Sequence, residues 1–246
     1  TEMGQDFYER AKQILADIAE TEAVIGQQAL QPAGLLHISV PMSFGINTLS
    51  DLLPDFCKRY PMLRLNIDLS DRLVDLVGDG FDVAVRLARI PSTNLIARKI
   101  APVRMMVCAA PAYLETHGIP TAPSELRDHD FLGYGYLATG DDLVLTTAKG
   151  DDVAVRITPQ VRASNGDVLR KLALAGLGIT VLPDYVVGED IARGRLTALL
   201  PGWSMNGFYL YAIYPKRDFL PIKVKVLIDY LVEKLGVNET TLASTA

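Results

Sequence analysis

Cysteine and histidine are scarce in this chain of 246 residues, which has two Cys and three His. Cys57 and Cys108 lie far apart in segments expected to be core, so buried free thiols are predicted and a disulfide framework is not. His37, His117 and His129 have no second His or Cys at metal-ligand spacing, which argues against a metal site. A structural or solvated role is predicted for each histidine.

Basic residues and long apolar runs are also lacking. There are 24 Lys and Arg against 29 Asp and Glu, a net charge of −5. Because nonspecific nucleic-acid binding needs clustered Lys and Arg to displace counterions from phosphates, these residues are not expected to hold DNA or RNA themselves. No run of about eighteen apolar residues and no export signal is found. We expect a cytoplasmic protein without a membrane partner.

Catalytic motifs are missing as well. The sequence contains no Gly-x-Ser-x-Gly, no phosphate-binding loop and no His-Glu-x-x-His. The segment AGLGI at 175–179 is superficially like a dinucleotide fingerprint. Its glycines, however, close a helix and open a strand, whereas a pyrophosphate site needs the order strand, glycines, helix. We therefore predict a protein that is not an enzyme and has no cofactor.

What the sequence does contain is the composition of a globular protein, 49% hydrophobic and 22% charged, which excludes disordered and fibrous classes. Residues 1–31 are expected to form a long linker helix, because apolar positions recur at the heptad spacing of a helix that pairs with a partner. The predicted pairing positions are Phe7, Ala11, Ile14, Ile18 and Ile25. Leu15, Val24 and Leu30 leave open the alternative of a helix packed on its own domain.

Beyond a break at residues 31–34, strands and helices alternate. Apolar strands are expected near 35–40, 63–69 and 81–87, with a helix over 49–60 and a short helix opened by Asp71. Such short connections give right-handed crossovers and a largely parallel sheet. The predicted fold class is α/β.

A second α/β unit follows, with a β-hairpin expected within 143–158 and a helix over 164–176. Long strands near 103–110 and 208–215 are expected to cross between the two units, as in a two-lobed ligand clamp. The predicted organisation is a linker helix at 1–31, a first lobe at 32–107 and 212–238, a second lobe at 108–211, and a flexible tail at 239–246.

Two predicted helix starts carry polar residues directly after strands. Met42, Ser43 and Phe44 follow the first strand, and Ser164 and Asn165 open a helix of the second unit. Ligands of open parallel sheets bind beyond the carboxyl ends of strands, where helix starts offer free N–H groups and about half a positive charge. The predicted ligand is a small anion, typically a carboxylate. Simple helix capping by Ser43 and Ser164 is the open alternative.

Three further side chains are candidates for the same site. Arg86 ends an apolar strand and is expected to point out of the core or into the crevice, the alternatives being a surface arginine or a partner for Asp82. Tyr134 and Tyr136, with Phe131, are expected either to line an aromatic wall or to belong to the hairpin core.

The order of several motifs resembles the effector-binding region of LysR-type transcriptional regulators, over about residues 5–236. The motifs are GLLHISVP at 34–41, RYP at 59–61, LVDLVGDGFDVAVR at 73–86, APAYL at 110–114, LAGLGITVLP at 174–183 and AIYPKR at 212–217. The resemblance implies two Rossmann-like lobes joined by two crossing strands, as in type 2 periplasmic-binding proteins, behind a linker helix that pairs subunits.

The resemblance also implies a small-molecule effector between the lobes, a homodimer or homotetramer, and control of promoter DNA through an N-terminal domain not present in this chain. The effector positions carried over are Met42, Ser43, Phe44, Arg86, Tyr134, Tyr136, Ser164 and Asn165. The alternatives are a solute-binding protein of a transport system, which needs an export signal, and an enzyme on the same scaffold.

Overall fold

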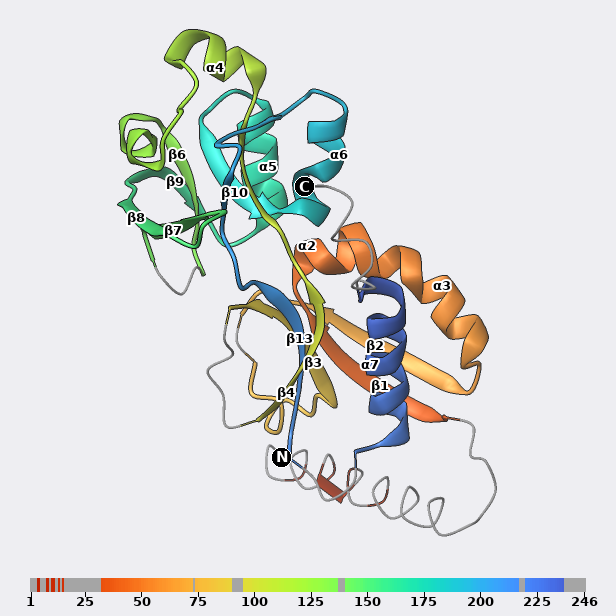
Figure 1. Cartoon of the computed structure of the whole chain (residues 1–246). Helices are drawn as coiled ribbons and strands as arrows, with labels where there is room; N and C mark the ends of the chain where they lie inside the picture. Colours follow the sequence, from red (N-terminus) through yellow and green to blue (C-terminus); the bar gives the residue numbers. More distant parts are fainter. Residues whose placement is uncertain are drawn as a thin grey trace.

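The computed structural model describes residues 32–72, 74–89, 95–136, 140–216 and 220–236, together with six residues of the N-terminal segment. Those six are Gly4, Tyr8, Arg10, Ala11, Gln13 and Leu15. The described residues form two α/β lobes, each around a five-stranded sheet, and two chain segments join the lobes (Figure 1). The predicted two-lobed α/β fold is therefore confirmed.

The sheet of the first lobe has the strand order β2-β1-β3-β13-β4. Its strands are β1 (Gly34–Val40), β2 (Leu63–Leu69), β3 (Val83–Ala88), β4 (Ile96–Pro102) and β13 (Tyr209–Tyr214). β1 pairs in parallel with β2 and β3, whereas β13 is antiparallel to both β3 and β4. The predicted parallel arrangement thus has one exception, the strand by which the chain returns from the second lobe.

One helical stretch follows β1 without interruption, as α2 (Met42–Phe44), the π-helical turn η1 (Gly45–Leu49) and α3 (Ser50–Arg59). α3 and the C-terminal helix α7 (Ile222–Leu235) lie on the same side of the sheet (Figure 1). The Tyr230 hydroxyl donates to the Leu52 carbonyl at 2.8 Å, and the Tyr230 and Phe56 rings are 5.1 Å apart. These contacts fix α7 against α3 over the core of the first lobe.

The short helix predicted after Asp71 is wrong for the described residues 74–80, of which 76–80 form turns and none is helical. The Asp75 carboxylate accepts the backbone N–H groups of Val77 at 3.1 Å and Gly78 at 3.0 Å. An Asp side chain that bonds nearby N–H groups in this way stabilises a turn in competition with a helix. Asp71 itself contacts the α2 start.

The second lobe contains a sheet of order β11-β5-β10-β6-β9 and a separate small sheet of order β12-β7-β8. The large sheet consists of β5 (Met105–Ala109), β6 (Phe131–Tyr134), β9 (Pro159–Ala163), β10 (Ile179–Pro183) and β11 (Thr197–Ala198). The small sheet consists of β7 (Asp142–Thr147), β8 (Asp152–Arg156) and β12 (Trp203–Ser204). The antiparallel pairing of β7 with β8 confirms the predicted hairpin.

Four helices belong to this lobe among the described residues: α4 (Pro111–His117), the 3-10 helix η2 (Pro123–Asp128), α5 (Gly166–Leu174) and α6 (Asp184–Ala192). α5 and α6 are tied together by Asp190, whose side chain is fully buried. Its carboxylate forms ion pairs with Arg170 of α5 and, at 2.6 Å, with Arg195 beyond α6. One buried acid therefore links three segments of the lobe.

The lobes are joined where the chain leaves β4 for β5 and where it enters β13. The Val103 N–H donates to the Phe208 carbonyl at 2.9 Å, so the two connections run side by side. β5 begins at Met105, and β4, which precedes it, was not predicted. β13 begins at Tyr209 and belongs wholly to the first sheet, so the predicted boundary after residue 211 divides it. The remaining domain boundaries stay predictions.

Most of the predicted linker helix cannot be compared with the structure. Phe7, Ile14, Ile18 and Ile25 lie outside the described residues, whereas Ala11 is helical and partly buried. Pairing through this seam remains a prediction. No helix within the described part of the chain is long and apolar enough to cross a membrane.

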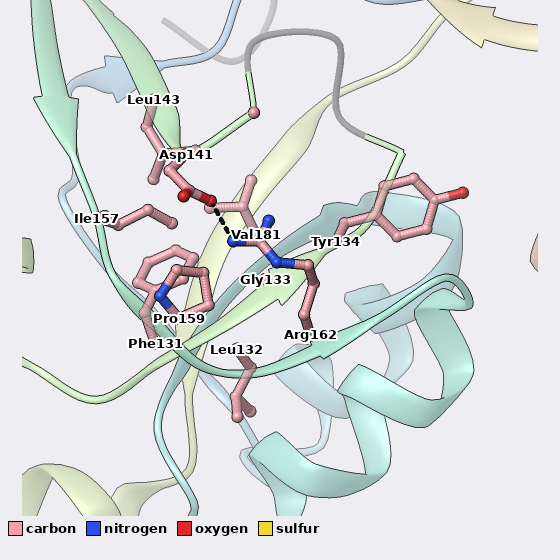
Figure 2. Close-up of a pocket in the computed structure, with 11 residues that line it drawn as sticks. Phe131, Leu132, Gly133, Tyr134, Asp141, Leu143, Ile157, Pro159, Arg162 and Val181 are labelled. Atoms are coloured by element: carbon pink, nitrogen blue, oxygen red, sulfur yellow. Dashed lines mark hydrogen bonds and ion pairs between the residues drawn. The ribbon is translucent and has the colours of Figure 1, made fainter.

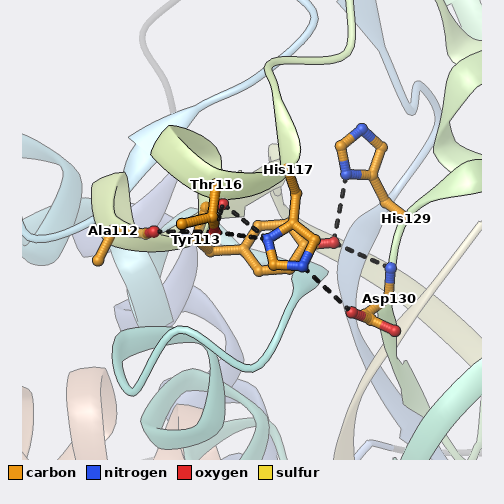
Figure 3. Close-up of polar contacts among 6 residues, drawn as sticks. All are labelled: Ala112, Tyr113, Thr116, His117, His129 and Asp130. Atoms are coloured by element: carbon orange, nitrogen blue, oxygen red, sulfur yellow. Dashed lines mark hydrogen bonds and ion pairs between the residues drawn. The ribbon is translucent and has the colours of Figure 1, made fainter.

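Two histidines, His117 and His129, lie around Tyr113 of α4 (Figure 3). The His117 ring stacks on Tyr113 with centroids 4.2 Å apart, and the Tyr113 hydroxyl lies 3.2 Å from Nδ1 of His129. The same hydroxyl accepts the Asp130 N–H at 2.9 Å. These histidines therefore take part in side-chain packing and hydrogen bonding.

The prediction of two buried thiols is wrong for Cys57, which is exposed on α3 and faces away from the core that Phe56 enters. Cys108 in β5 is buried, and this burial, aided by the negative charge of Asp190, raises the pKa of its thiol to about 12. Both cysteines are free. They differ in access and in the fraction of reactive thiolate.

Thiol titration is expected to separate the two cysteines. In the native protein at pH 8, an aromatic disulfide reagent should modify Cys57 and leave Cys108 intact, because Cys108 is inaccessible and protonated. The measurement is the number of thiols released per chain, expected to rise from one to two on adding denaturant. The Cys57→Ser variant is the control. Two fast-reacting thiols in the native protein would contradict the described packing of β5.

Candidate functional site between the lobes

The two helix starts predicted to carry the site belong to opposite lobes and meet at the lobe boundary. Pro41 precedes α2 and provides no side-chain cap, so Ser43 lies inside the helix. Asn165, and not Ser164, caps α5, because its side-chain oxygen accepts the Val168 N–H at 3.2 Å. Simple capping by Ser43 or Ser164 is therefore wrong.

A pair of hydrogen bonds connects the lobes directly at these helix starts. The Ser43 hydroxyl donates to Oδ2 of Asp167 at 2.7 Å, and the Asn47 amide donates to Oδ1 of the same carboxylate at 3.1 Å. A Cβ atom at Gly166 would lie only 3.2 Å from the Ser43 hydroxyl oxygen. Asn47 and Asp167 were not among the predicted site residues, although an acid in the first turn of a helix is a usual partner of its N–H groups.

Phe44 also contributes to this boundary, but as a packing residue. It is fully buried, and its ring meets that of Tyr185 from α6 edge-on, with centroids 5.9 Å apart. Burial raises the pKa of Tyr185, and the negative charges of Asp71 and Asp167 raise it further. Both carboxylates therefore act on the same side chain at the lobe boundary.

Beside this contact lies a second polar group centred on Asp71. Its carboxylate accepts the Met42 N–H, at the start of α2, at 3.3 Å. Burial raises the pKa of Asp71 and outweighs the opposite effects of Met42, Asn165, Arg86 and Tyr134. Asp71 thus shows that the α2 start accepts a carboxylate, and it was not among the predicted site residues.

Tyr134 and Asn165 face Asp71 from the second lobe. Burial raises the pKa of the Tyr134 hydroxyl, and the neighbouring charge of Asp71 raises it further. The amide nitrogen of Asn165 is buried without a hydrogen-bond partner of good geometry. An unpartnered buried donor of this kind is costly, and a ligand with an acceptor group could satisfy it.

Arg86 is only 9% exposed, so the surface alternative is wrong. Its Nη1 donates to the carbonyls of Val85 at 2.7 Å and Ser39 at 3.2 Å. Its Nη2 donates to the Ser39 hydroxyl at 2.8 Å and the Arg72 carbonyl at 3.1 Å. The guanidinium therefore supplies positive charge to the site while its terminal donors hold β1 and the segment after β2.

The partner expected for Arg86 in the alternative, Asp82, instead pairs with Lys223 of α7 at 2.7 Å. Of the remaining candidates, both Met42 and Ser164 are exposed. Tyr136 is 47% exposed, with its ring meeting Tyr134 edge-on at 6.1 Å. The structure thus brings Ser43, Arg86, Tyr134, Asn165 and the backbone N–H of Met42 to one boundary, whereas the side chains of Met42, Ser164 and Tyr136 are exposed.

A different pocket lies inside the second lobe, between β6, β7 and β9 (Figure 2). Leu143, Ile157 and Val181 give it an apolar lining, and an ion pair between Arg162 and Asp141 at 2.7 Å closes one side. Tyr134 lies at its edge, with its hydroxyl directed away from the apolar side chains (Figure 2). The pocket does not include the contact between Ser43 and Asp167, and Tyr134 is the residue that borders both the pocket and the lobe boundary.

The Asp71→Asn variant is expected to be at least as stable as wild type at pH 7. Because the folded state raises the pKa of Asp71, folding disfavours its ionised form, and the neutral amide avoids this cost. The difference in the free energy of unfolding between the variant and wild type should shrink as the pH falls through the folded-state pKa of Asp71, because Asp71 is then itself protonated. Urea unfolding at successive pH values measures the effect, with the exposed Asp68→Asn as control. An Asp71→Asn protein less stable than wild type at pH 7 would contradict it.

Among the described residues, no group of three or more His, Cys, Asp or Glu is arranged to hold a metal ion. Two lobes joined by paired connections, with polar side chains from both meeting at the boundary, define a two-lobed fold of the periplasmic-binding-protein type. Residues 29–236 match the family described as the LysR substrate binding domain. The chain belongs to the LysR-type transcriptional regulators, as its motifs predicted.

Relatives among known proteins agree. The chain is 32% identical over 239 residues to the HTH-type transcriptional regulator CrgA of Neisseria meningitidis, covering 97% of this chain and 79% of CrgA. It is also 32% identical to the HTH-type transcriptional activator AaeR of Escherichia coli, covering 95% of this chain and 76% of AaeR. These relatives confirm the prediction of a regulator rather than an enzyme and favour it over a transport protein.

Solved structures give the same assignment. The CrgA regulatory domain from Neisseria meningitidis aligns with a TM-score of 0.72 at 32% identity, covering 83% of this chain and all of that domain. The longer CrgA structure aligns with a TM-score of 0.73, covering 96% of this chain and 80% of CrgA. The described lobes are thus the effector-binding domain of a LysR-type regulator.

Proposed function

We propose that this protein senses a small organic effector carrying an anionic group, bound between the lobes. The observation that carries the proposal is the meeting of the α2 and α5 starts, where Ser43 and Asn165 from opposite lobes lie at one boundary. Helix starts favour negative charge, and the Asp71 carboxylate on the Met42 N–H is an internal example. Arg86 adds a buried positive charge.

We propose further that the effector changes the lobe geometry and that paired linker helices, in a homodimer or homotetramer, pass the change to promoter DNA. The printed names of the relatives, HTH-type transcriptional regulators, support a role at DNA. With a net charge of −5, these residues are suited to sensing and assembly, and DNA contact is assigned to an N-terminal domain. The proposed location is the cytoplasm.

A thermal-shift screen of small organic acids tests the effector class. A ligand present at about 100 times its dissociation constant stabilises the folded state by about 2.7 kcal/mol, so a matching acid should raise the melting temperature clearly. Neutral amides of the same acids should not. If no acid stabilises the protein while neutral compounds do, the anionic class is wrong.

Two variants locate the binding of any acid found in that screen. Asn165→Asp keeps a capping side chain at α5 but adds a negative charge at the boundary, so it should abolish most of the stabilisation. Arg162→Ala alters the separate pocket of the second lobe and should retain it. Loss of stabilisation in Arg162→Ala with retention in Asn165→Asp would move the site out of the lobe boundary.

A further inference from the structure

Asp167 binds across the lobe boundary with both of its carboxylate oxygens. Ser43 donates to one oxygen and Asn47 to the other, and these residues lie more than a hundred positions from Asp167 in the sequence. Ser43 and Asn47 are four residues apart on one helical stretch, so their side chains face the same point. Asn47 also donates to the Ser43 carbonyl at 2.9 Å, which fixes its amide. The first lobe thus presents a two-donor seat for a carboxylate.

Asp167 of the protein itself occupies this two-donor seat, formed by Ser43 and Asn47. The charges around the seat affect where an anionic effector can bind. The boundary carries the carboxylates of Asp71 and Asp167 and the guanidinium of Arg86, whose terminal donors bind backbone and Ser39. The charge of Arg170 also acts on Asp167, but Arg170 is paired with Asp190. An anionic ligand added beside Asp167 would face a net negative group at short range. A ligand that replaces Asp167 leaves the charge in the seat unchanged and keeps both donors bonded.

We infer that Asp167 is a displaceable internal ligand, and that the carboxylate of the effector takes its place on Ser43 and Asn47. The inference rests on the proposed function for the identity of the ligand. Displacement removes the two hydrogen bonds between α2–η1 and α5, so the lobes separate on that side. The effector carboxylate and Asp167 therefore compete for the same two donors, and this competition couples effector binding to a change of lobe geometry. Removing the Asp167 side chain should change the lobe geometry in the same way as the effector does.

Distance measurement between the lobes tests the contact without any ligand. Spin labels are placed on the exposed Cys57 of α3 and on a cysteine introduced by Glu115→Cys in α4, which is also exposed, while the buried Cys108 stays unlabelled. The full chain is used, diluted with unlabelled Cys57→Ser protein so that pulsed electron resonance reports distances within one chain. Circular dichroism and thermal melting establish that each variant is folded.

The Asp167→Ala variant is expected to give longer and broader distances than the parent protein. The double variant Ser43→Ala/Asn47→Ala removes both donors from the other lobe and should shift the distance distribution in the same direction. If Asp167→Ala does not fold, the double variant alone tests the contact. Asp51→Ala, which removes an exposed acid of α3, is the matched control and should have no effect. A parent-like distribution in the Asp167→Ala and double variants would overturn the inference.

Titration with acetate, and with acetamide as its neutral counterpart, tests the competition. Acetate should shift the parent distribution toward that of Asp167→Ala, and its half-saturating concentration should be about fivefold or more lower for Asp167→Ala. Lobe opening in Asp167→Ala without acetate binding to either protein would refute the anionic effector and leave the contact standing. Equal acetate binding to both proteins, with unchanged distances, would refute the displacement and leave the proposed function standing.

Discussion

Replacing Asp190 with alanine is expected to lower the free energy of unfolding by about 3 kcal/mol. Asp190 is fully buried and pairs with Arg170 and Arg195, so its loss leaves two cations without their partner and breaks the link between α5 and α6. Breaking a buried pair by removing one member costs about 3–5 kcal/mol, and the lower end applies because both arginines reach solvent. The corresponding fall in melting temperature is about 6–12 °C.

Chemical denaturation of Asp190→Ala and of Glu189→Ala provides the measurement and its control. Glu189 is the preceding residue on the same helix, and its ion pair with Arg193 at 2.5 Å is solvent-exposed. Exposed pairs of this spacing contribute about 0.3–0.5 kcal/mol, so Glu189→Ala should unfold close to wild type. Equal, small effects of the two substitutions would show that Asp190 does not link the helices as described.

Replacing Arg86 with lysine is expected to destabilise the protein by about 2 kcal/mol, even though the charge is kept. The two terminal nitrogens of the guanidinium donate hydrogen bonds to acceptors on Ser39, Arg72 and Val85. A lysine ammonium is a point donor and lacks this planar fork. Buried acceptors left without donors cost about 1–3 kcal/mol each.

Arg64→Lys, on the exposed side of β2, is the matched control and should change stability by less than about 0.5 kcal/mol. The comparison distinguishes two roles for Arg86. If Arg86 served only to attract an anionic effector, lysine would preserve the stability of the ligand-free protein. An unfolding midpoint for Arg86→Lys equal to that of wild type would therefore contradict its role in holding β1.

Much of the fold could be predicted because its signals are local. The apolar runs that become β1, β2 and β3 and the hairpin of β7 and β8 are visible within a few residues of sequence. β4 was missed, because its sequence IARKIAP mixes charges with apolar residues at the edge of the sheet. The turn after Asp71 was also missed, since the carboxylate of Asp75 competes with the helix that the spacing favoured.

The site could be predicted only in part, for a different reason. The placement of Met42, Ser43 and Asn165 follows from the rule that helix starts collect ligand-binding groups in α/β folds. Arg86, expected at the end of a strand, lies instead inside β3 and pairs with Tyr211 of β13. The Ser43–Asp167 contact joins residues from different lobes, and no local pattern contains it. It depends on how closely the lobes approach, which sequence periodicity does not encode.

The exchange of backbone amide hydrogens, with and without a stabilising acid, tests most directly whether the effector binds between the lobes. In the presence of the acid, slower exchange is expected at the start of α2 and η1, residues 42–47, and faster exchange at the start of α5, residues 165–169, where Asp167 is released. The α4 and α7 helices should be unchanged. Slower exchange confined to β6, β7 and β9, around the pocket of the second lobe, would contradict binding between the lobes.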